Sequence, residues 1–155
     1  MHTANSIIIR APKNAIFETA ANLELWPKIL PHYRYIRYLE RGADRNLVVM
    51  AARRWGLPIS WTSEQIIDRD RCEVRFHHLK AWTKGMDVVS FQETPAGVLV
   101  EIVHELHFRI RLLAPIAEPL ISNGFIHPVA SRTLRWMKMY LESQATSVLQ
   151  PQTHG

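Results

Sequence analysis

Five polar side chains share an expected inner strand face with apolar residues: Ser63, Gln65, His78, Ser90 and His104. A neutral histidine exchanges protons near neutral pH, and a hydroxyl or an amide can orient a carbonyl group by hydrogen bonding. Together such groups could remove a proton from carbon beside a carbonyl and stabilise the enolate that forms. We therefore treat His78 and His104 as acid or base candidates, with Ser63 and Gln65 orienting a carbonyl.

These side chains must be positioned by strands, because residues two apart on a strand share one face of a sheet. The residues that we expect on the inner face are Ile59, Trp61, Ser63, Gln65, Ile67, Val74, Phe76, His78, Met86, Val88, Ser90, Gln92 and His104. A buried polar group needs a partner, so each polar member is either satisfied by a neighbour or faces a wet or ligand-filled cavity. Four strands each contribute such a group, and both interpretations stay open.

The region from residue 32 to 111 lacks helical periodicity and contains six segments with strand character. They are 33–41, 46–55, 59–68, 72–80, 86–93 and 98–111. A β-branched strand at 6–10 precedes them. The connections within the region are short and rich in Gly, Pro and Asp, which is typical of antiparallel hairpins. We predict a seven-stranded antiparallel sheet with one wet face.

Helices are predicted on both sides of this region. A helix at 12–21 and a short helical piece at 23–30 follow the first strand, and a long amphipathic helix spans 115–143. Pro128 removes an interior hydrogen bond and predicts either a kink near 124–128 or a helix start there, and we favour the kink. The first part of this helix is apolar on more than one side, so we expect the sheet to wrap around it. The fold class is α+β.

Composition indicates one globular domain over residues 1–143, followed by a flexible tail at 144–155. The 155 residues are 47% hydrophobic, carry a net charge of +5 and include one cysteine. No apolar run approaches the length of a membrane span and no signal peptide is evident, so we predict a cytoplasmic location. The basic residues are scattered, which argues against nucleic-acid binding. His104 and His107 point to opposite faces of one strand, and we predict no metal site and no cofactor.

Several segments carry a resemblance to a known superfamily. They are NSIIIRAP at 5–12, WPKILPHY at 26–33, WTS at 61–63, GM at 85–86 and RTLRWMK at 132–138. In order and spacing over residues 5–142 they resemble the START and Bet v 1-like (SRPBCC) superfamily, and most of all its polyketide cyclase/dehydrase group, the aromatase/cyclases. The resemblance implies the helix-grip fold, in which a curved antiparallel sheet wraps a long C-terminal helix and encloses a deep apolar cavity.

The resemblance also implies that the cavity binds a poly-β-keto chain held by an acyl carrier protein. The ligand contacts that we expect from the inner face and the resemblance are Trp26, Tyr33, Trp61, Phe76, Met86, Ser90 and Phe108. Gln65 stands where these relatives have a cavity arginine, and His78 stands where they have a second one. Either Arg53 or Arg54 could point inward and substitute for the missing charge.

Two hypotheses follow. In the first, the protein is a cyclase acting on a β-keto or aromatic substrate, which the cluster of polar candidates favours. In the second, it is a non-catalytic carrier of a lipid, a quinone or a polyketide, which the missing arginine favours. Two further contacts are considered: a homodimer formed through an outer strand or the long helix, and peripheral membrane contact through the apolar segment 110–121 beside Arg109 and Arg111.

Overall fold

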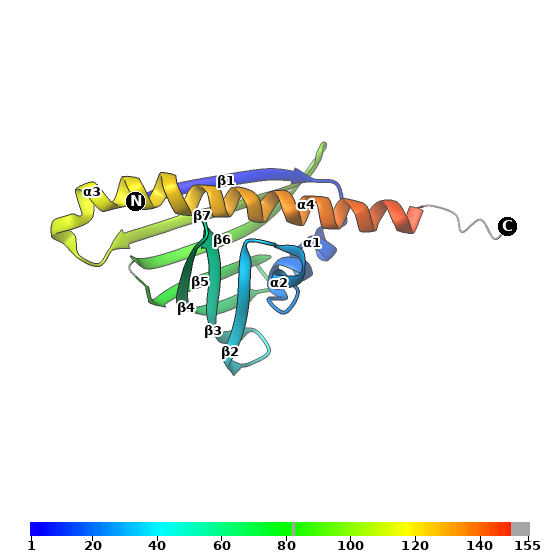
Figure 1. The fold of residues 1–155 in the computed structure, drawn as a ribbon. Coiled ribbons are helices and arrows are strands. Elements are labelled where there is room, and N and C mark those ends of the chain that lie inside the picture. The colour runs from blue at the N-terminus through cyan, green and yellow to red at the C-terminus, as the bar shows by residue number, and fades with distance from the viewer. Residues whose placement is uncertain (82, 150–155) are drawn as a thin grey trace.

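The centre of the molecule is a seven-stranded antiparallel sheet with the order β1-β7-β6-β5-β4-β3-β2 (Figure 1). Its strands are β1 (His2–Ile9), β2 (Tyr33–Arg41), β3 (Arg45–Arg54), β4 (Leu57–Asp68), β5 (Glu73–Lys80), β6 (Thr83–Thr94) and β7 (Gly97–Phe108). The structure is a computed structural model that describes residues 1–81 and 83–149, with side chains described as far as residue 146. The strands from β2 to β7 form the predicted meander, and β1 pairs with β7.

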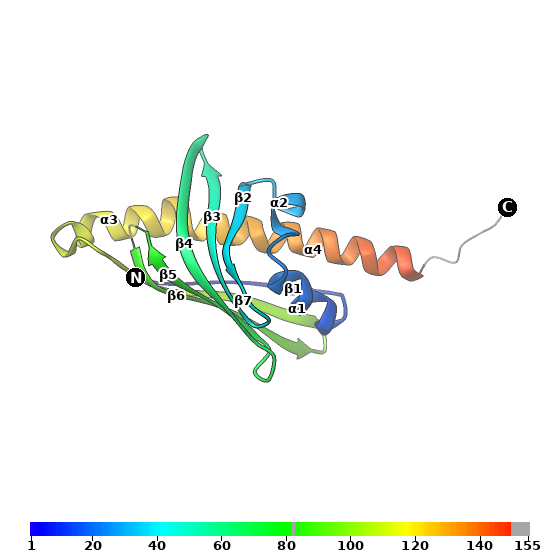
Figure 2. The ribbon, with the colours of Figure 1, turned by 90° about the horizontal axis from the view of Figure 1, so that it is seen from below.

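The helices fall in the two places that the sequence predicts. They are α1 (Lys13–Ala21), α2 (Trp26–Ile29), the 3-10 turn η1 (Arg111–Leu113), α3 (Ala114–Ile121), the π-helical turn η2 (Ser122–Ile126) and α4 (His127–Leu149). Helix α4 packs beside β1 and against α1 and α2. Viewed from below, the curved sheet arches beside this long helix (Figure 2). The helix-grip prediction is confirmed.

The amphipathic stripe predicted for α4 forms the helical half of the core. Its buried members, together with Ile126 of η2, are Ile126, Val129, Ala130, Thr133, Leu134, Met137 and Leu141. The residues expected opposite them include Arg132 and Arg135, and both are exposed. Removing so many apolar side chains from water is the largest favourable contribution to folding, at about 25 cal/mol per Å² of buried apolar surface.

The inner faces of three strands follow the predicted alternation, and the inner face of β6 does not. On β4, β5 and β7 the buried positions are those expected, as Ile67, Val74 and Val100 illustrate. On β6 the buried residues are Thr83, Val89 and Phe91, so the prediction for this strand is wrong by one position. Both faces of this strand carry apolar side chains, and its pattern therefore did not distinguish them. The consequence is that Asp87, rather than its neighbours, faces inward.

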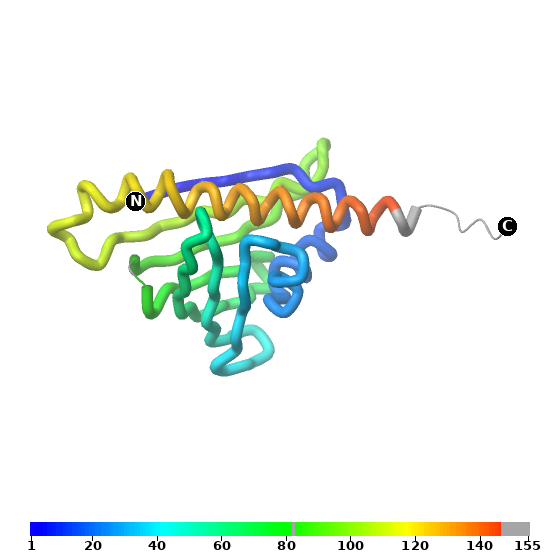
Figure 3. Tube along the Cα trace, viewed as in Figure 1, coloured from blue at the N-terminus to red at the C-terminus, as the bar shows by residue number. Residues whose placement is uncertain are grey.

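The segment before α4 is the second point where the expectation is wrong. At the place where Pro128 predicts a kink, the chain adopts the π-helical turn η2. The trace nevertheless continues from α3 through η2 into α4 (Figure 3). Helix α3 has no buried residue, so the sheet does not wrap it. Instead α3 projects past the strands at the end of the molecule opposite the end of α4 (Figure 1).

The end of α4 also lies beyond the predicted position. The helix runs to Leu149, whereas we expected a flexible tail from residue 144. Residues 150–155 of that predicted tail lie outside the described part of the chain. Among the described residues, none of the helices is both long and apolar enough to cross a membrane.

Candidate active-site cavity

A cavity of about 770 Å³ lies between the sheet and the helices. Strands β3 to β7 contribute to its wall, and α3, η2 and α4 cover it on the other side. Most of its lining side chains are apolar, as is usual for sites that bind small organic molecules. Four of the ligand contacts expected from the sequence border it: Trp26, Tyr33, Trp61 and Phe76.

Aromatic rings form a connected wall along this cavity. The Trp26 ring lies 5.4 Å from Tyr33 and 5.7 Å from Phe76 between ring centroids. The Trp61 ring continues the series, at 6.2 Å from Tyr33 and 6.4 Å from Phe125 of η2. These separations are typical of edge-to-face and tilted aromatic contacts, which hold large flat side chains in fixed positions. The wall offers a rigid apolar surface to a planar ligand.

The polar part of the cavity is a carboxylate between two histidines. The Nε2 atom of His78 lies 2.8 Å from Oδ2 of Asp87. The Nε2 atom of His104 lies 3.7 Å from the other carboxylate oxygen. The register explains this geometry, because Asp87 is the direct cross-strand partner of His104 while His78 lies on β5, on the other side of β6. All three residues border the cavity.

Burial sets the electrostatics of this group. It lowers the pKa of His104 below the ordinary 6.5, because the charged imidazolium would lose its hydration; the nearby Asp87 carboxylate opposes the shift and His78 adds to it. His104 is therefore mostly neutral at neutral pH and able to accept a proton. Three buried polar atoms of the group have no hydrogen-bond partner among the described residues: Nδ1 of His78, Nδ1 of His104 and Oδ1 of Asp87. In native proteins such atoms usually find a water or a ligand.

A second polar chain borders the cavity on the helix side. Thr133 of α4 hydrogen-bonds the Tyr33 hydroxyl, and its Oγ1 lies 2.9 Å from Nε2 of His32. Burial and the Asp87 charge raise the pKa of Tyr33, so the phenol stays protonated and can donate a hydrogen bond. Burial and the charge of Arg132 lower the pKa of His32 to about 4.

Of the two candidate arginines, Arg54 borders the cavity, and Arg53 borders a separate outer groove. The Nε atom of Arg54 donates to the carbonyl oxygen of Gly124 at 3.0 Å. Pro128 has no N–H to offer this carbonyl four residues earlier, so the arginine supplies a donor that the helix lacks. The guanidinium also lies 4.4 Å from the centroid of the Trp55 ring. Arg54 thus connects β3 to the π-helical turn η2. We call the exposed part of the cavity lining, at Trp55, Leu57 and Leu120, the mouth of the cavity.

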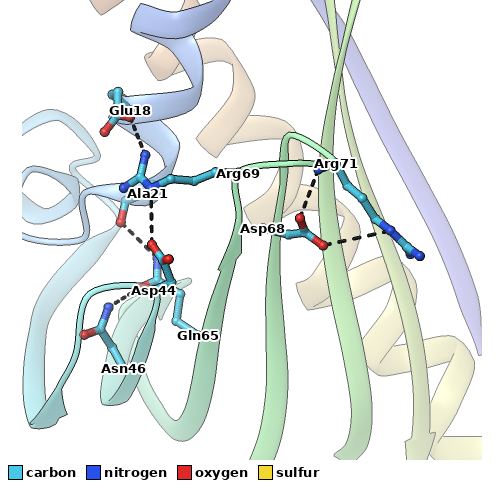
Figure 4. Close-up of polar contacts among 8 residues, drawn as sticks. All are labelled: Glu18, Ala21, Asp44, Asn46, Gln65, Asp68, Arg69 and Arg71. Atoms are coloured by element: carbon cyan, nitrogen blue, oxygen red, sulfur yellow. Dashed lines mark hydrogen bonds and ion pairs between the residues drawn. The ribbon is translucent and has the colours of Figure 1, made fainter.

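Gln65 is fully buried, but it does not border the cavity. Its Nε2 donates to the Ala21 carbonyl oxygen at 2.9 Å, and its Oε1 accepts from Nδ2 of Asn46 at 2.9 Å (Figure 4). Asn46 in turn accepts a bond from the Gly42 amide. The expectation that Gln65 orients a substrate carbonyl is therefore wrong in this structure, because its amide is already engaged with the protein. Ser63 is fully buried as well, and it also lies outside the cavity lining.

Three expected ligand contacts do not reach the cavity: Met86, Ser90 and Phe108. The first two point away because the inner face of β6 is shifted by one residue from the prediction. Phe108 is buried on the predicted face of β7, but it lies outside the lining of the cavity. Asp87 is the functional candidate that the sequence reasoning missed. The available signal was a lone acid between Met86 and Val88 on a strand flanked by two histidine-bearing strands.

Within residues 1–81 and 83–149, no group of three or more metal-ligating side chains is suited to hold a metal ion. The polar centre of the cavity has one carboxylate and two imidazoles, and the carboxylate accepts a hydrogen bond from His78. What the arrangement can do is accept, hold and return a proton beside an apolar surface that positions an organic molecule.

Comparisons with known proteins agree with this geometry. No protein-family model matches the chain. A protein from Streptomyces halstedii named as a polyketide cyclase is 33% identical over 103 residues, which cover 64% of this chain and 94% of that relative. The crystal structure of the Zhui aromatase/cyclase from Streptomyces sp. R1128 has a TM-score of 0.82 at 13% identity, covering 97% of this chain and 99% of that one.

A START superfamily protein from Mycobacterium smegmatis has a TM-score of 0.72 at 10% identity and covers 92% of this chain and 98% of that one. At such low identities the two structures show only that the fold is shared. The family assignment rests on the sequence similarity to the Streptomyces halstedii relative. By its sequence similarity to that relative, this chain belongs to the polyketide cyclase family.

Proposed function

We propose that the protein binds a poly-β-keto substrate in the cavity and catalyses its ring closure as a polyketide cyclase or aromatase. The observation that carries the proposal is the Asp87 carboxylate between His78 and His104, at the wall of a cavity otherwise lined mainly by apolar and aromatic side chains. The name of the Streptomyces halstedii relative, a polyketide cyclase, supports the reaction class, and the size of the cavity supports an extended organic substrate.

Ring closure and loss of water need four proton movements and one new carbon–carbon single bond. A base removes a proton from a carbon between two carbonyl groups, and the enolate carbon attacks another carbonyl carbon of the same chain. The resulting alkoxide takes a proton to become an alcohol. The base then removes a further proton from carbon, and the acid protonates the hydroxyl group as it leaves as water, which forms a carbon–carbon double bond. Enolisation of the carbonyl groups in that ring completes the aromatic system. One acid and one base near the reacting carbons suffice for all of these steps.

His104 is the base in this proposal, because its lowered pKa keeps it neutral and ready to accept a proton at neutral pH. Asp87 stabilises the imidazolium that then forms. His78, whose Nε2 lies 2.8 Å from the same carboxylate, gives a proton to the alkoxide and takes back, through Asp87, the proton that His104 removed from carbon. The Tyr33 ring, between Trp26 and Trp61, belongs to the aromatic wall against which the substrate packs.

Delivery of the substrate by an acyl carrier protein is part of the same proposal. A second groove, with a volume of about 540 Å³, is bordered by Arg53, Arg132 and Arg135 and by no acidic side chain. Trp55 borders both this groove and the main cavity. Three guanidinium groups beside the mouth favour an anionic partner surface. Replacing both Arg132 and Arg135 by Gln should weaken carrier binding and its dependence on salt, while leaving turnover of a free substrate unchanged.

A non-catalytic carrier of a lipid, a quinone or a polyketide is the second candidate. The observation that favours it is that, among the described lining residues, no arginine is left free to polarise a carbonyl group: the Nε of Arg54 donates to the Gly124 carbonyl oxygen, and Gln65, which stands where the relatives have an arginine, lies outside the cavity. Such a protein would hold its ligand by apolar burial alone. The two candidates differ in whether the histidines matter for turnover.

The deciding experiment has two stages. Native mass spectrometry of the purified protein, with denaturing extraction in parallel, identifies any small molecule that it retains. A synthetic poly-β-keto thioester is then incubated with the wild type and with the His104→Gln and His78→Gln variants, and chromatography follows the aromatic product. We expect each variant to lose about a hundredfold in kcat/KM.

His107→Gln is the matched control, because His107 lies on the same strand as His104 but is exposed on the opposite face. It should turn over substrate like the wild type. Wild-type rates in all three variants would remove the proposed acid and base roles. A ligand bound without any product would favour the carrier candidate.

A further inference from the structure

The end of the molecule that holds the cavity mouth exposes large apolar side chains to an unusual degree. The four most exposed ones among the described residues are Leu112 at 89%, Trp55 and Ile116 at 71%, and Leu120 at 70%. Leu112, Ile116 and Leu120 lie within η1 and α3, and Trp55 lies in the turn between β3 and β4. Single exposed leucines are ordinary on a protein surface, but a group at one end indicates an interaction site.

This apolar surface reaches the cavity. Leu120, Ile121, Trp55 and Leu57 all border the cavity, and Leu57 is 62% exposed in addition to Trp55 and Leu120. In Figure 1, α3 extends past the sheet at one end of the molecule, so no other element of the described chain covers it. A molecule that leaves or enters the cavity between β4 and α3 therefore passes over exposed leucine and isoleucine side chains.

Charge distinguishes among the occupants that such a surface could accept. Residues 107–121 contain Arg109 and Arg111 and a single acid, Glu118. The Glu118 carboxylate accepts a hydrogen bond from the Phe108 amide at 3.0 Å, which ties α3 to the end of β7. The negative charge of Glu118 is therefore engaged in a hydrogen bond within the protein.

The neighbouring hairpin adds further positive charge. The Arg109 side chain donates to the carbonyl oxygens of Leu79 and Ala81 at 2.8 and 2.7 Å, which holds the β5–β6 connection beside this segment. Lys80 and Lys84 flank that connection and are exposed. Apolar side chains bordered by exposed cations match the interface of an anionic lipid bilayer. The apolar side chains insert into the acyl region, and the anionic headgroups attract the cations.

We propose that the surface formed by η1 and α3, with Trp55 and Leu57 beside it, docks on anionic membranes and places the cavity mouth against the bilayer. The released product then exchanges with the apolar phase without crossing water. This interaction goes beyond the proposed cyclase reaction and does not depend on it, because binding to a bilayer requires no turnover.

Sedimentation with vesicles tests the proposal on the purified full chain. The vesicles contain phosphatidylcholine alone or phosphatidylcholine with phosphatidylglycerol. The wild type should sediment with the anionic vesicles at low salt, and less so at high salt, because ions screen the attraction. The Leu112→Ser/Ile116→Ser double variant should bind about tenfold or more weakly, since it loses two apolar side chains from the contact.

Two matched variants complete the design. Leu39→Ser replaces an exposed leucine on β2, outside the proposed surface, and should bind vesicles like the wild type. Arg111→Gln should bind less tightly and show a weaker response to salt. Thermal unfolding of each variant verifies that its fold is intact.

Three outcomes would overturn the proposal: no sedimentation of the wild type at low salt, equal binding by the double variant, or equal binding to neutral and anionic vesicles. Light scattering tests the alternative occupant of this surface, a second copy of the chain, by measuring the molecular weight in solution. A wild-type dimer that the double variant converts to a monomer would assign this surface to contact between two copies of the chain and would likewise overturn membrane docking.

Discussion

Two buried polar clusters lie on the inner face of the same sheet, and they differ in how fully the protein satisfies them. In the first, the Gln65 amide bonds to Asn46 and to the Ala21 carbonyl oxygen, and Asn46 bonds to Gly42. In the second, the Asp87 carboxylate lies between His78 and His104, and three polar atoms have no partner. Only the second cluster borders the cavity.

This difference separates a structural role from a chemical one. A polar group whose bonds are all made by the protein stabilises one arrangement of the chain and has nothing to offer a ligand. A cluster with unmet hydrogen-bonding capacity costs stability, and it is retained where a ligand or a reaction uses it. We therefore expect substitutions in the two clusters to affect different properties, with turnover sensitive to one and stability to the other.

The largest effect should come from Asp87→Asn. Asparagine keeps the shape of the side chain but removes the charge that stabilises an imidazolium on His104, and its amide cannot accept at both oxygen positions. We expect kcat/KM on a poly-β-keto thioester to fall by about a hundredfold or more. Steady-state kinetics measures the change, and denaturant unfolding reports on the fold.

Asp70→Asn provides the control for this substitution, because Asp70 is exposed in the turn between β4 and β5. Its kinetics should match those of the wild type. If Asp87→Asn kept a wild-type rate, the acid–base role of the cavity cluster would be excluded. The two clusters would then no longer differ in chemical role.

Gln65→Leu should have the next largest effect, and that effect should be on stability. Leucine has a similar size, but it leaves the Asn46 amide and the Ala21 carbonyl oxygen buried without a partner. We expect the free energy of unfolding to fall by about 2 kcal/mol, with kcat/KM unchanged when measured well below the melting temperature. Gln92→Leu is the matched control, because Gln92 is exposed on β6. A loss of activity without a loss of stability would contradict the structural role.

The fold could be predicted from the sequence because its signals are local and repeated. Alternation of apolar and polar residues located six of the strands, and the 3.6-residue period located α4. Helix α3 was misjudged for a physical reason: an apolar segment looks the same in sequence whether it is covered by the protein or left exposed. Ile116 and Leu120 could be assigned to the surface only once the path of the chain was known.

The candidate site was predicted less completely, because it depends on contacts between strands. His78 and His104 were found from alternation alone. Asp87 was missed because both faces of β6 carry apolar residues, so the rule of alternation gave no unique inner face. Gln65 was placed on the correct face, but no sequence pattern reports that the Ala21 carbonyl oxygen lies within hydrogen-bonding distance of it. The pairing of distant residues decides which buried polar group remains available to a ligand.

The smallest predicted effect is a pH dependence that again separates the two clusters. Burial lowers the pKa of His104, with Asp87 and His78 as the charged neighbours that act on it, whereas the Gln65 cluster has no titratable side chain. Between pH 7 and 5 the unfolded chain binds a proton at this histidine more readily than the folded protein does. The free energy of unfolding should therefore decrease as the pH falls through about 6.5.

His32, whose pKa burial lowers to about 4, contributes to the same slope. His104→Gln should show a shallower slope than the wild type in urea unfolding at several pH values, because one of the two contributions is gone. Gln65→Leu should show the wild-type slope at a lower stability. An unchanged slope in His104→Gln would mean that this histidine is as easily protonated in the folded protein as in the unfolded chain, and it would remove the physical basis for choosing His104 as the base.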